Sequence, residues 1–170
     1  VESLLDIQRL EEGKAVLDAK PISIHALLAE AAQLVQPLIH ESEQKLSLNY
    51  PEYLPLITCD ADMVLRVITN LMENAVKYTP MGGKITLSAN MVTNAVRITV
   101  NDSGPGIAAN MQGKIFEKFS RVKYKDAPKG VGLGLAFCRL AVEAHGGRIW
   151  VESQGDGQGS TFTFSLKAVK

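Results

Sequence analysis

The feature that most limits how this chain can fold is a long stretch, residues 103–129, that has little hydrophobic periodicity. It contains several glycines and prolines, and regularly patterned segments lie on both sides of it. A connection of this length inside a compact domain is usually a functional lid or a disordered segment. Because 170 residues suit one compact domain with a short appendage, the stretch is expected to join two parts of a single domain.

The part before this stretch contains two strong helical patterns and several strand patterns. Apolar residues recur at helical spacing over residues 24–43 and again over residues 64–76. Pro37 should bend or unsettle the first helix because it removes a backbone donor, and Asp60 can cap the second helix. The segments that read as strands are residues 22–24, 46–50, 84–90 and 95–101.

The part after the stretch begins with glycines that open an apolar helix over residues 133–145, which Gly146 and Gly147 close. Residues 148–153 and 160–166 then have the pattern of a final hairpin. Helices on one face of a mixed, mainly antiparallel sheet are the simplest architecture for this order of elements. The expected fold class is therefore α+β, arranged as a two-layer α/β sandwich.

Composition and charge limit the environment and the partners of the chain. Eighteen basic residues balance eighteen acidic ones, so there is no electrostatic reason to expect nucleic acid as a partner. No apolar run reaches the length of about 20 residues needed to span a bilayer, and no signal peptide opens the chain. Cys59 and Cys138 lack metal-ligand spacing and read as buried thiols in a reducing compartment. We expect a cytoplasmic piece of a longer protein, without direct membrane contact of its own.

A polar stripe on the second helix is the first candidate for a functional site. Asn70 and Asn74 are four residues apart, and Lys77 follows three residues later, so the three side chains share one face. Amide oxygens are hard ligands that suit magnesium, which usually takes few protein ligands together with phosphates. The alternative is an ordinary solvated stripe.

Two glycine-containing motifs flank the long stretch. In the sequence DSGPG at residues 102–106, glycines would let the backbone approach a flat ligand, and the Asp102 carboxylate could accept a hydrogen bond from an exocyclic amine. The same residues also read as a simple turn. In the sequence GVGLG at residues 130–134, amides at a helix N-terminus could bind phosphate. This second motif does not match the phosphate loop of NTPases, nor does a strand immediately precede it as in a dinucleotide fold.

The order and spacing of the three motifs resemble the N, G1 and G2 boxes of the ATP-binding superfamily shared by DNA gyrase, MutL and histidine kinases. The sequence IFEKF at residues 115–119 resembles the F box of histidine kinases. Residues 4–11 look like the end of the dimerisation helix that precedes the catalytic domain in such kinases. The resemblance implies a Bergerat-type domain at residues 20–170, an ATP lid at about 103–132, and the end of a dimerisation helix plus linker at residues 1–19.

The resemblance also implies roles for single residues. Asn74 would coordinate magnesium, with Asn70 beside it, while Lys77 and Arg121 would approach the phosphates. Asp102 would bind the adenine amine. Tyr78 and Thr161 would lie near the base, and Phe116 and Phe119 would anchor the lid unless they are ordinary core residues. Val131 stands where many relatives have Ser or Thr. The implied nucleotide-binding set is Asn70, Asn74, Lys77, Tyr78, Asp102, Gly104, Gly106, Ile107, Phe119, Arg121, Gly130, Val131, Gly132, Leu133, Gly134 and Thr161.

Three functions fit this resemblance, and the first is favoured. A histidine kinase domain would bind Mg-ATP and phosphorylate a histidine on a separate dimerisation domain, within a homodimeric parent that serves a response regulator receiver domain. The chain itself lacks the acceptor, because none of its three histidines has the phosphoacceptor signature and all read as structural. A gyrase-type hydrolase would need a glutamate at position 70, and Glu73 is expected on a different helical face. The third alternative is a nucleotide-binding module, or a serine kinase related to anti-sigma factors.

Overall fold

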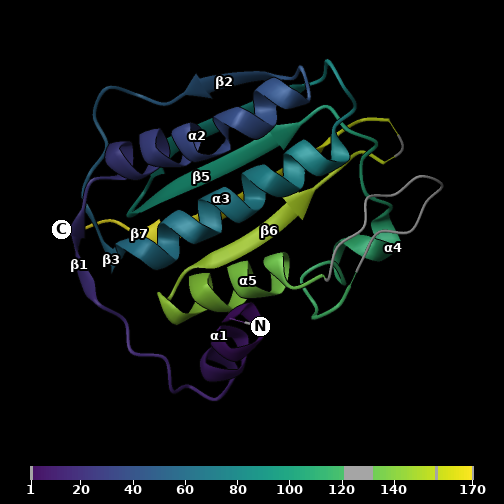
Figure 1. Ribbon diagram of the computed structural model, residues 1–170. Coiled ribbons are helices and arrows are strands. Elements are labelled where there is room, and N and C mark those ends of the chain that lie inside the picture. The colour runs from purple at the N-terminus through teal and green to yellow at the C-terminus, as the bar shows by residue number, and fades with distance from the viewer. Residues whose placement is uncertain (1, 121–131, 156, 170) are drawn as a thin grey trace.

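The computed structural model describes residues 2–120, 132–155 and 157–169, and its ribbon is drawn in Figure 1. Within these residues, helices and strands are mixed along the sequence. Their bounds are α1 (Glu2–Glu11), β1 (Ala19–Ile22), α2 (Ile24–Glu41), β2 (Lys45–Asn49), β3 (Ile57–Asp60), α3 (Ala61–Tyr78), β4 (Lys84–Val92), β5 (Ala95–Asp102), α4 (Ala109–Gln112), α5 (Gly134–Ala144), β6 (Arg148–Glu152) and β7 (Ser160–Lys167).

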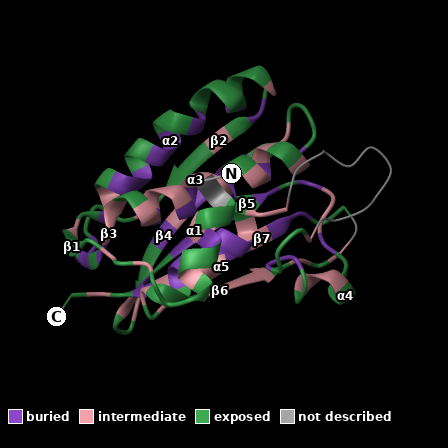
Figure 2. Ribbon diagram, turned by 60° about the horizontal axis from the view of Figure 1, so that its bottom comes forward, coloured by how far each residue is buried: buried purple, intermediate pink, exposed green. Residues whose placement is uncertain are grey.

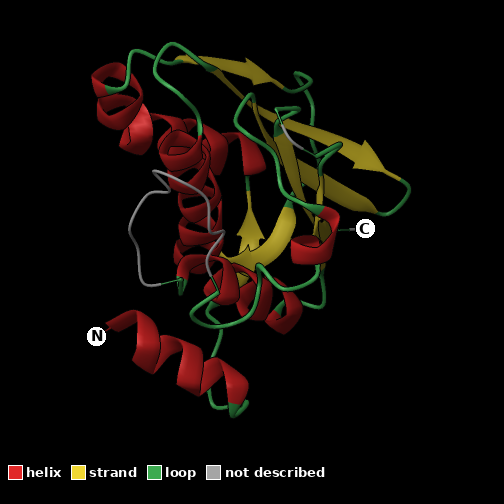
Figure 3. Ribbon diagram, turned by 90° about the vertical axis from the view of Figure 1, so that its right-hand side faces the viewer, coloured by secondary structure: helices red, strands yellow, loops and turns green. Residues whose placement is uncertain are grey.

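The strands form one large sheet and one small one. The large sheet has the order β2-β4-β5-β7-β6, in which only β2 and β4 pair in parallel. The small sheet consists of β1 and β3, which are antiparallel. The long helices α2, α3 and α5 cover one face of the large sheet, and no described helix covers its other face (Figure 3). The expected two-layer α+β architecture is confirmed.

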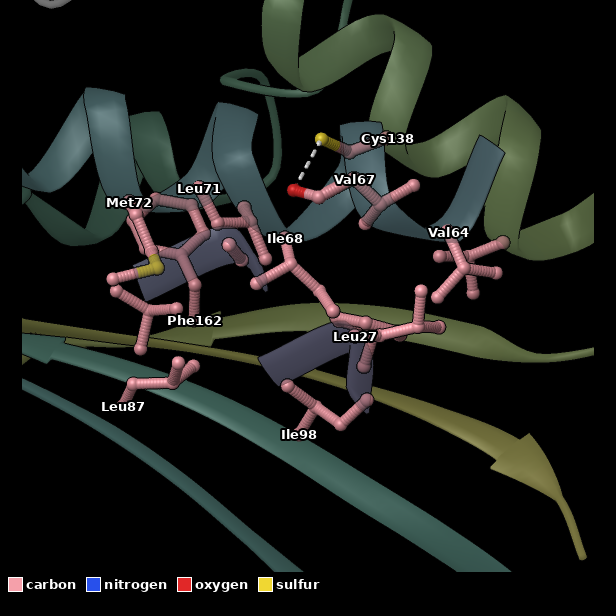
Figure 4. Packing of buried hydrophobic residues seen from close by; sticks show 14 of the residues in the cluster. Leu27, Val64, Val67, Ile68, Leu71, Met72, Leu87, Ile98, Cys138 and Phe162 are labelled. Carbon is pink, nitrogen blue, oxygen red and sulfur yellow. Dashed lines mark hydrogen bonds between the residues drawn. The ribbon is translucent and has the colours of Figure 1, made fainter. Parts of the chain in front are cut away.

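The core lies between the helices and the sheet. In β5 the side chains of Val96, Ile98 and Val100 are fully buried under the helices, while alternate residues point to the opposite face. Figure 4 shows Ile68, Leu71 and Met72 of α3 above residues of the sheet such as Ile98 and Phe162. The burial pattern along the chain, drawn in Figure 2, follows the same division between inner and outer faces.

Helix α3 is held at both ends by side chains, and this fixes its polar stripe in space. At its start, Asp60 Oδ1 accepts a hydrogen bond from Met63 N at 3.1 Å, as the sequence predicted for this cap. At its end, the buried Gln44 side chain donates from Nε2 to the carbonyl oxygens of Val76 (3.1 Å) and Thr79 (2.8 Å). These two carbonyls have no partner within the helix, so Gln44 stabilises the last turn.

Three local features differ from the sequence-based expectation. Strand β3 was not predicted, because its four residues pair with the equally short β1 and, through one bridge from Ile57, with Ala168, and they follow a proline-containing loop. Helix α2 continues beyond Pro37 to Glu41, since Pro37 lies on its exposed side and buried residues such as Val35 and Ile39 hold the helix on the sheet. The described part of the long stretch, residues 103–120, contains a short helix, α4.

Helix α1 packs against α5 although the sequence suggested an incoming segment outside the core. Its Ile7 side chain is fully buried in the core cluster. Asp6 Oδ2 forms an ion pair with Arg66 of α3 at 2.6 Å, and Glu11 pairs with Lys118 at 2.9 Å. Gly13, with φ of +69°, follows the helix and allows the chain to turn toward β1.

Candidate functional site

A cavity opens between α3, the adjoining ends of β5 and β7, the start of α5 and the segment that follows β5. It gathers residues that are far apart in sequence, and both polar and apolar groups line it. The lining residues are Asn70, Glu73, Asn74, Lys77, Tyr78, Asp102, Pro105, Gly106, Ile107, Ile115, Ser120, Gly132, Gly134, Leu135, Ser160 and Phe162.

One wall of the cavity is the polar stripe of α3. Asn70, Asn74, Lys77 and Tyr78 all line it, so the structure brings together the four residues that sequence reasoning selected from this helix. Asn70 Nδ2 donates to the carbonyl oxygen of Gly134 at 3.4 Å, which joins α3 to the first residue of α5. Glu73 lines the cavity as well, and its expected placement on a different helical face was wrong. Residues three apart on a helix are neighbours, so Glu73 lies beside Asn70.

Asp102 lies at the end of β5, with only 5% of its surface exposed. Burial raises the pKa of its carboxyl group, and hydrogen bonds from the backbone amides of Gly104 and Ser160 oppose part of that rise. The bond from Gly104 N to Asp102 Oδ1 measures 2.9 Å. A buried carboxylate in a cavity is a strong acceptor for a donor group on a ligand.

The glycines after β5 permit a close approach of backbone segments. A Cβ on Gly104 would lie 2.7 Å from the carbonyl oxygen of Tyr78, so Gly104 allows the segment after β5 to touch the end of α3. Gly106 lines the cavity with φ of +82°, and a Cβ there would lie 2.0 Å from the Gly155 carbonyl oxygen. Gly104 does not line the cavity, so its role is to place Asp102 and Tyr78 together and not to face a ligand.

The two aromatic residues of the 115–119 segment behave differently. Phe116 is buried and meets the ring of Phe162 in a T-shaped, edge-to-face arrangement, with ring centroids 6.1 Å apart, so it anchors the segment to the core. Phe119 is 58% exposed, has φ of +62° and does not line the cavity. Its backbone N–H donates to the carbonyl oxygen of Gly132 at 2.9 Å, which links the segment to the chain just before α5.

Thr161 does not reach the cavity, and its neighbours do. Its hydroxyl oxygen accepts a hydrogen bond from Asn101 Nδ2 at 2.7 Å on the helix-free face of the sheet. Successive side chains of a strand point to opposite faces, so Ser160 and Phe162 line the cavity instead. Sequence reasoning named Thr161 at the base, whereas the residues on either side of it line the cavity. The alternation of buried residues along β7 is the signal that could have found Ser160.

The remaining predicted residues fall into three groups. Ile107, Gly132 and Gly134 line the cavity, as expected. Leu133 is partly buried against the core and does not line the cavity. Arg121, Gly130 and Val131 lie outside the described residues.

The histidines and cysteines have structural surroundings. His25 Nε2 lies 2.8 Å from the Pro51 carbonyl oxygen, and His145 Nε2 accepts from Asp60 N at 3.1 Å. Burial raises the pKa of Cys59 to about 11 and that of Cys138 to about 12, so both stay thiols.

In the part of the chain that the structure describes, no cluster of three or more His, Cys, Asp or Glu side chains could hold a metal ion. No described helix is both long and apolar enough to cross a membrane.

Comparisons with known proteins identify similar sequences and structures. The family model described as histidine kinase-, DNA gyrase B-, and HSP90-like ATPase matches residues 59–170. The adaptive-response sensory kinase SasA of Thermosynechococcus vestitus is 40% identical over 167 residues, which cover 98% of this chain and 44% of that protein. SasA of Microcystis aeruginosa is 44% identical over 119 residues, covering 69% of this chain and 31% of that protein. The chain thus spans less than half the length of these relatives.

Two solved structures are similar over most of the chain. Full-length ShkA in complex with AMPPNP superposes with a TM-score of 0.86 and 33% identity, covering 99% of this chain and 35% of ShkA. The nucleotide-free catalytic domain of the histidine kinase ThkA superposes with a TM-score of 0.78 and 28% identity, covering 89% of this chain and 96% of that domain.

Proposed function

The chain belongs to the family of histidine kinase-, DNA gyrase B- and HSP90-like ATPases, and we propose that it acts there as the catalytic domain of a protein-histidine kinase. Its sequence and fold are those of an ATP-binding kinase domain. The activity of the longer parent protein, its phosphoryl acceptor and its partners belong to the proposal.

The observation that carries the proposal is that two different kinds of polar group line the cavity. Asp102 provides a buried acceptor at the end of β5 that suits the exocyclic amine of adenine. Asn70, Asn74 and Lys77 provide amide groups and a cation on α3 that suit phosphates. A ligand with an amine at one end and several negative charges at the other fits both sets, and ATP is such a ligand.

The cavity also fits a magnesium ion brought in with the nucleotide. Asn74 and Asn70 offer amide oxygens, which are hard ligands, and the described residues contain no carboxylate cluster that would hold a metal without phosphates. Asn74 would be its protein ligand. When bound, the ion would neutralise charge on the phosphate oxygens, while Lys77 and the backbone at Gly132 and Gly134 would position them.

In the proposed reaction, an imidazole nitrogen of a histidine on a separate dimerisation domain attacks the γ-phosphorus of ATP. The bond from that phosphorus to the β–γ bridging oxygen breaks, and ADP leaves. Catalysis of this kind rests mainly on positioning and charge stabilisation. The parent protein would be a homodimer whose kinase domain acts in the cytoplasm. A receiver domain of a response regulator would then accept the phosphoryl group from the phosphorylated histidine. ThkA, a structural neighbour, has been solved in complex with the response regulator TrrA.

ATP hydrolysis is the second candidate, because Glu73 lines the cavity. A hydrolase needs a base near the attacking water. The position four residues before Asn74 is occupied by Asn70, whose amide cannot take a proton and whose Nδ2 already donates to Gly134. We therefore favour the kinase.

Labelled ATP separates the candidates. The chain is incubated with γ-labelled ATP, with and without the dimerisation domain of the same parent. We expect label only on the added domain, stable in base and lost in acid, and little phosphate release by the chain alone. Rapid phosphate release that disappears in Glu73→Gln would indicate a hydrolase. Acid-stable label would indicate a serine kinase, and unimpaired ATP binding without any transfer would indicate a binding module.

A further inference from the structure

The helix-free face of the large sheet is a second polar surface, on the side away from the helices (Figure 3). Because Val96, Ile98 and Val100 of β5 point inward, the residues between them point outward, and the strand register extends this face across the sheet. Most of its residues are Ser, Thr and Asn. Its charged residues are the cations Lys45, Lys84, Arg97, Arg148 and Lys167, and, among the described strand residues, the single carboxylate Glu152.

The charge of this face differs from that of the whole chain. The chain as a whole has equal numbers of basic and acidic residues, so an excess of four positive charges here is balanced elsewhere. None of the five cations forms an ion pair with a carboxylate of the described residues. A surface with one sign of charge attracts partners of the opposite sign.

Two of the cations converge on the same aromatic ring. The guanidinium carbons of Arg97 and Arg148 lie 5.2 Å and 5.0 Å from the ring centroid of Trp150, so they are at most about 10 Å apart. Both arginines are in register with Ser165, which lies between them on β7. Trp150 Nε1 donates to Glu152 Oε1 at 3.1 Å, which fixes the ring. The ring thus holds two planar donors of like charge close together.

We propose that this face is a docking surface for an acidic polypeptide segment, with its carboxylates bound by Arg97 and Arg148 beside Trp150. Guanidinium groups bind carboxylates through paired hydrogen bonds, and holding them against a ring reduces the entropy lost on binding. Arginine and tryptophan are also the residue types that dominate binding energy in protein interfaces.

Two observations favour a polypeptide over a membrane or a nucleic acid. By the register, the exposed strand residues Leu48 and Met91 point to the opposite face, and the large apolar residues on this face, Val92 and Trp150, are only partly exposed, so the face offers little to insert into a bilayer. Two guanidinium groups already occupy the Trp150 ring, so it is not free to stack on a base. The surface lies across the sheet from the cavity and does not depend on the proposed kinase function.

The test uses Trp150, the only tryptophan of the chain, as a fluorescence probe of this face. The full chain is titrated with a short polyglutamate peptide at low and at high salt, with and without saturating ADP. We expect a saturable change in emission that weakens with salt and is insensitive to ADP. Arg97→Gln and Arg148→Gln should each weaken peptide binding at least about fivefold, because each removes a paired, charge-assisted hydrogen bond. The matched controls Lys14→Gln and Lys20→Gln also remove one positive charge each, from exposed side chains elsewhere on the chain. They should change the peptide affinity less than about twofold.

Three results would overturn the proposal. The first is the absence of a saturable response in the wild-type chain. The second is an equal loss in the lysine controls, which would indicate attraction to overall charge. The third is tighter, arginine-dependent binding of phosphatidylglycerol vesicles or single-stranded DNA, which would assign the face to another class of partner. An unchanged ADP affinity of the two arginine variants shows that they remain folded.

Discussion

Asp102 is the residue at which stability and binding make opposite demands. It is buried at the end of β5, and desolvation favours its neutral form more than the amides of Gly104 and Ser160 favour its charged form. A buried carboxylate that gains little from its own protein lowers the stability of the folded state at neutral pH. Its presence is explained if a ligand donates to it.

The first prediction follows from this conflict. Asp102→Asn keeps the shape of the side chain but replaces a charged acceptor, so ADP affinity should fall roughly 10- to 100-fold, the equivalent of about 1.5–3 kcal/mol. The thermal unfolding midpoint should stay the same or rise. Calorimetric titration and a melting curve measure the two effects, with Glu30→Gln on the exposed face of α2 as the charge control. Wild-type ADP affinity in Asp102→Asn would show that the carboxylate does not contact the nucleotide.

A second prediction concerns pH and the same carboxyl group. Its pKa in the folded chain lies above the ordinary value of 3.8, so the folded state keeps this proton to a higher pH than the unfolded state. The contribution of Asp102 is therefore most favourable at low pH and is lost as the pH rises through its folded pKa. The free energy of unfolding of Asp102→Asn, relative to wild type, should increase from pH 4 toward neutrality in urea titrations. A constant or falling difference would contradict the raised pKa.

Residue identities at the site were predictable where a helix or a strand end fixed the geometry. Asn70, Asn74 and Lys77 share a helical face by spacing alone, and Asp102 ends a strand. Thr161 was predicted near the base, but its side chain points to the face of the sheet away from the helices. A shift of one residue along a strand moves a side chain to the other face, and the turn before β7 contains no sequence signal that fixes the register. Glu73 was misplaced because the lining of the cavity covers a wider arc of α3 than one stripe.

At the scale of elements, the position of α3 decides the geometry of the site. The last turn of α3 carries Lys77 and Tyr78. The side chain of Gln44, the residue directly before β2, donates hydrogen bonds to the carbonyl oxygens of Val76 and Thr79 at this end of the helix. Sequence patterns predicted helix α3 and strand β2, but they did not predict the contact of Gln44 with α3. A buried glutamine that is 32 residues from its partner leaves no periodic signal in the sequence.

The third prediction is that Gln44→Leu disturbs the site from a distance. The change leaves two buried carbonyl groups without their donor, which should cost about 1–3 kcal/mol of stability. Lys77 and Tyr78 would lose their fixed position, so ADP affinity should fall at a temperature where the variant is still folded. Gln33→Leu, on the exposed side of α2, is the matched control and should leave both quantities within about 0.5 kcal/mol of wild type. A loss of stability with unchanged ADP affinity would limit Gln44 to a structural role.

At the scale of the whole molecule, the open question is how tightly α1 belongs to the domain that binds nucleotide. The sequence predicted a boundary near residue 20, yet Ile7 is fully buried against α5 and Glu11 pairs with Lys118 of the segment next to the cavity. Burial of one isoleucine is a strong local contact, while an exposed ion pair contributes less than about 1 kcal/mol. The residues that line the cavity come from α3, β5, β7, α5 and the chain around residues 105–120.

The last prediction is therefore that Ile7→Ala undocks α1 and leaves the nucleotide site nearly intact. Removing a buried isoleucine side chain costs about 2–5 kcal/mol, more than a helix of ten residues held otherwise by two partly exposed ion pairs and the partly buried Leu10 can withstand. Amides of residues 2–11 should lose protection in hydrogen exchange, while those of α3 and β5 keep it. ADP affinity should change less than fivefold, because the two described ion pairs of α1, with Arg66 of α3 and with Lys118, involve no residue that lines the cavity. Leu5→Ala, at a half-exposed position of the same helix, is the control and should leave α1 docked. If ADP affinity collapses together with the protection of α3, then α1 is part of the catalytic domain, and the boundary predicted at residue 20 is wrong.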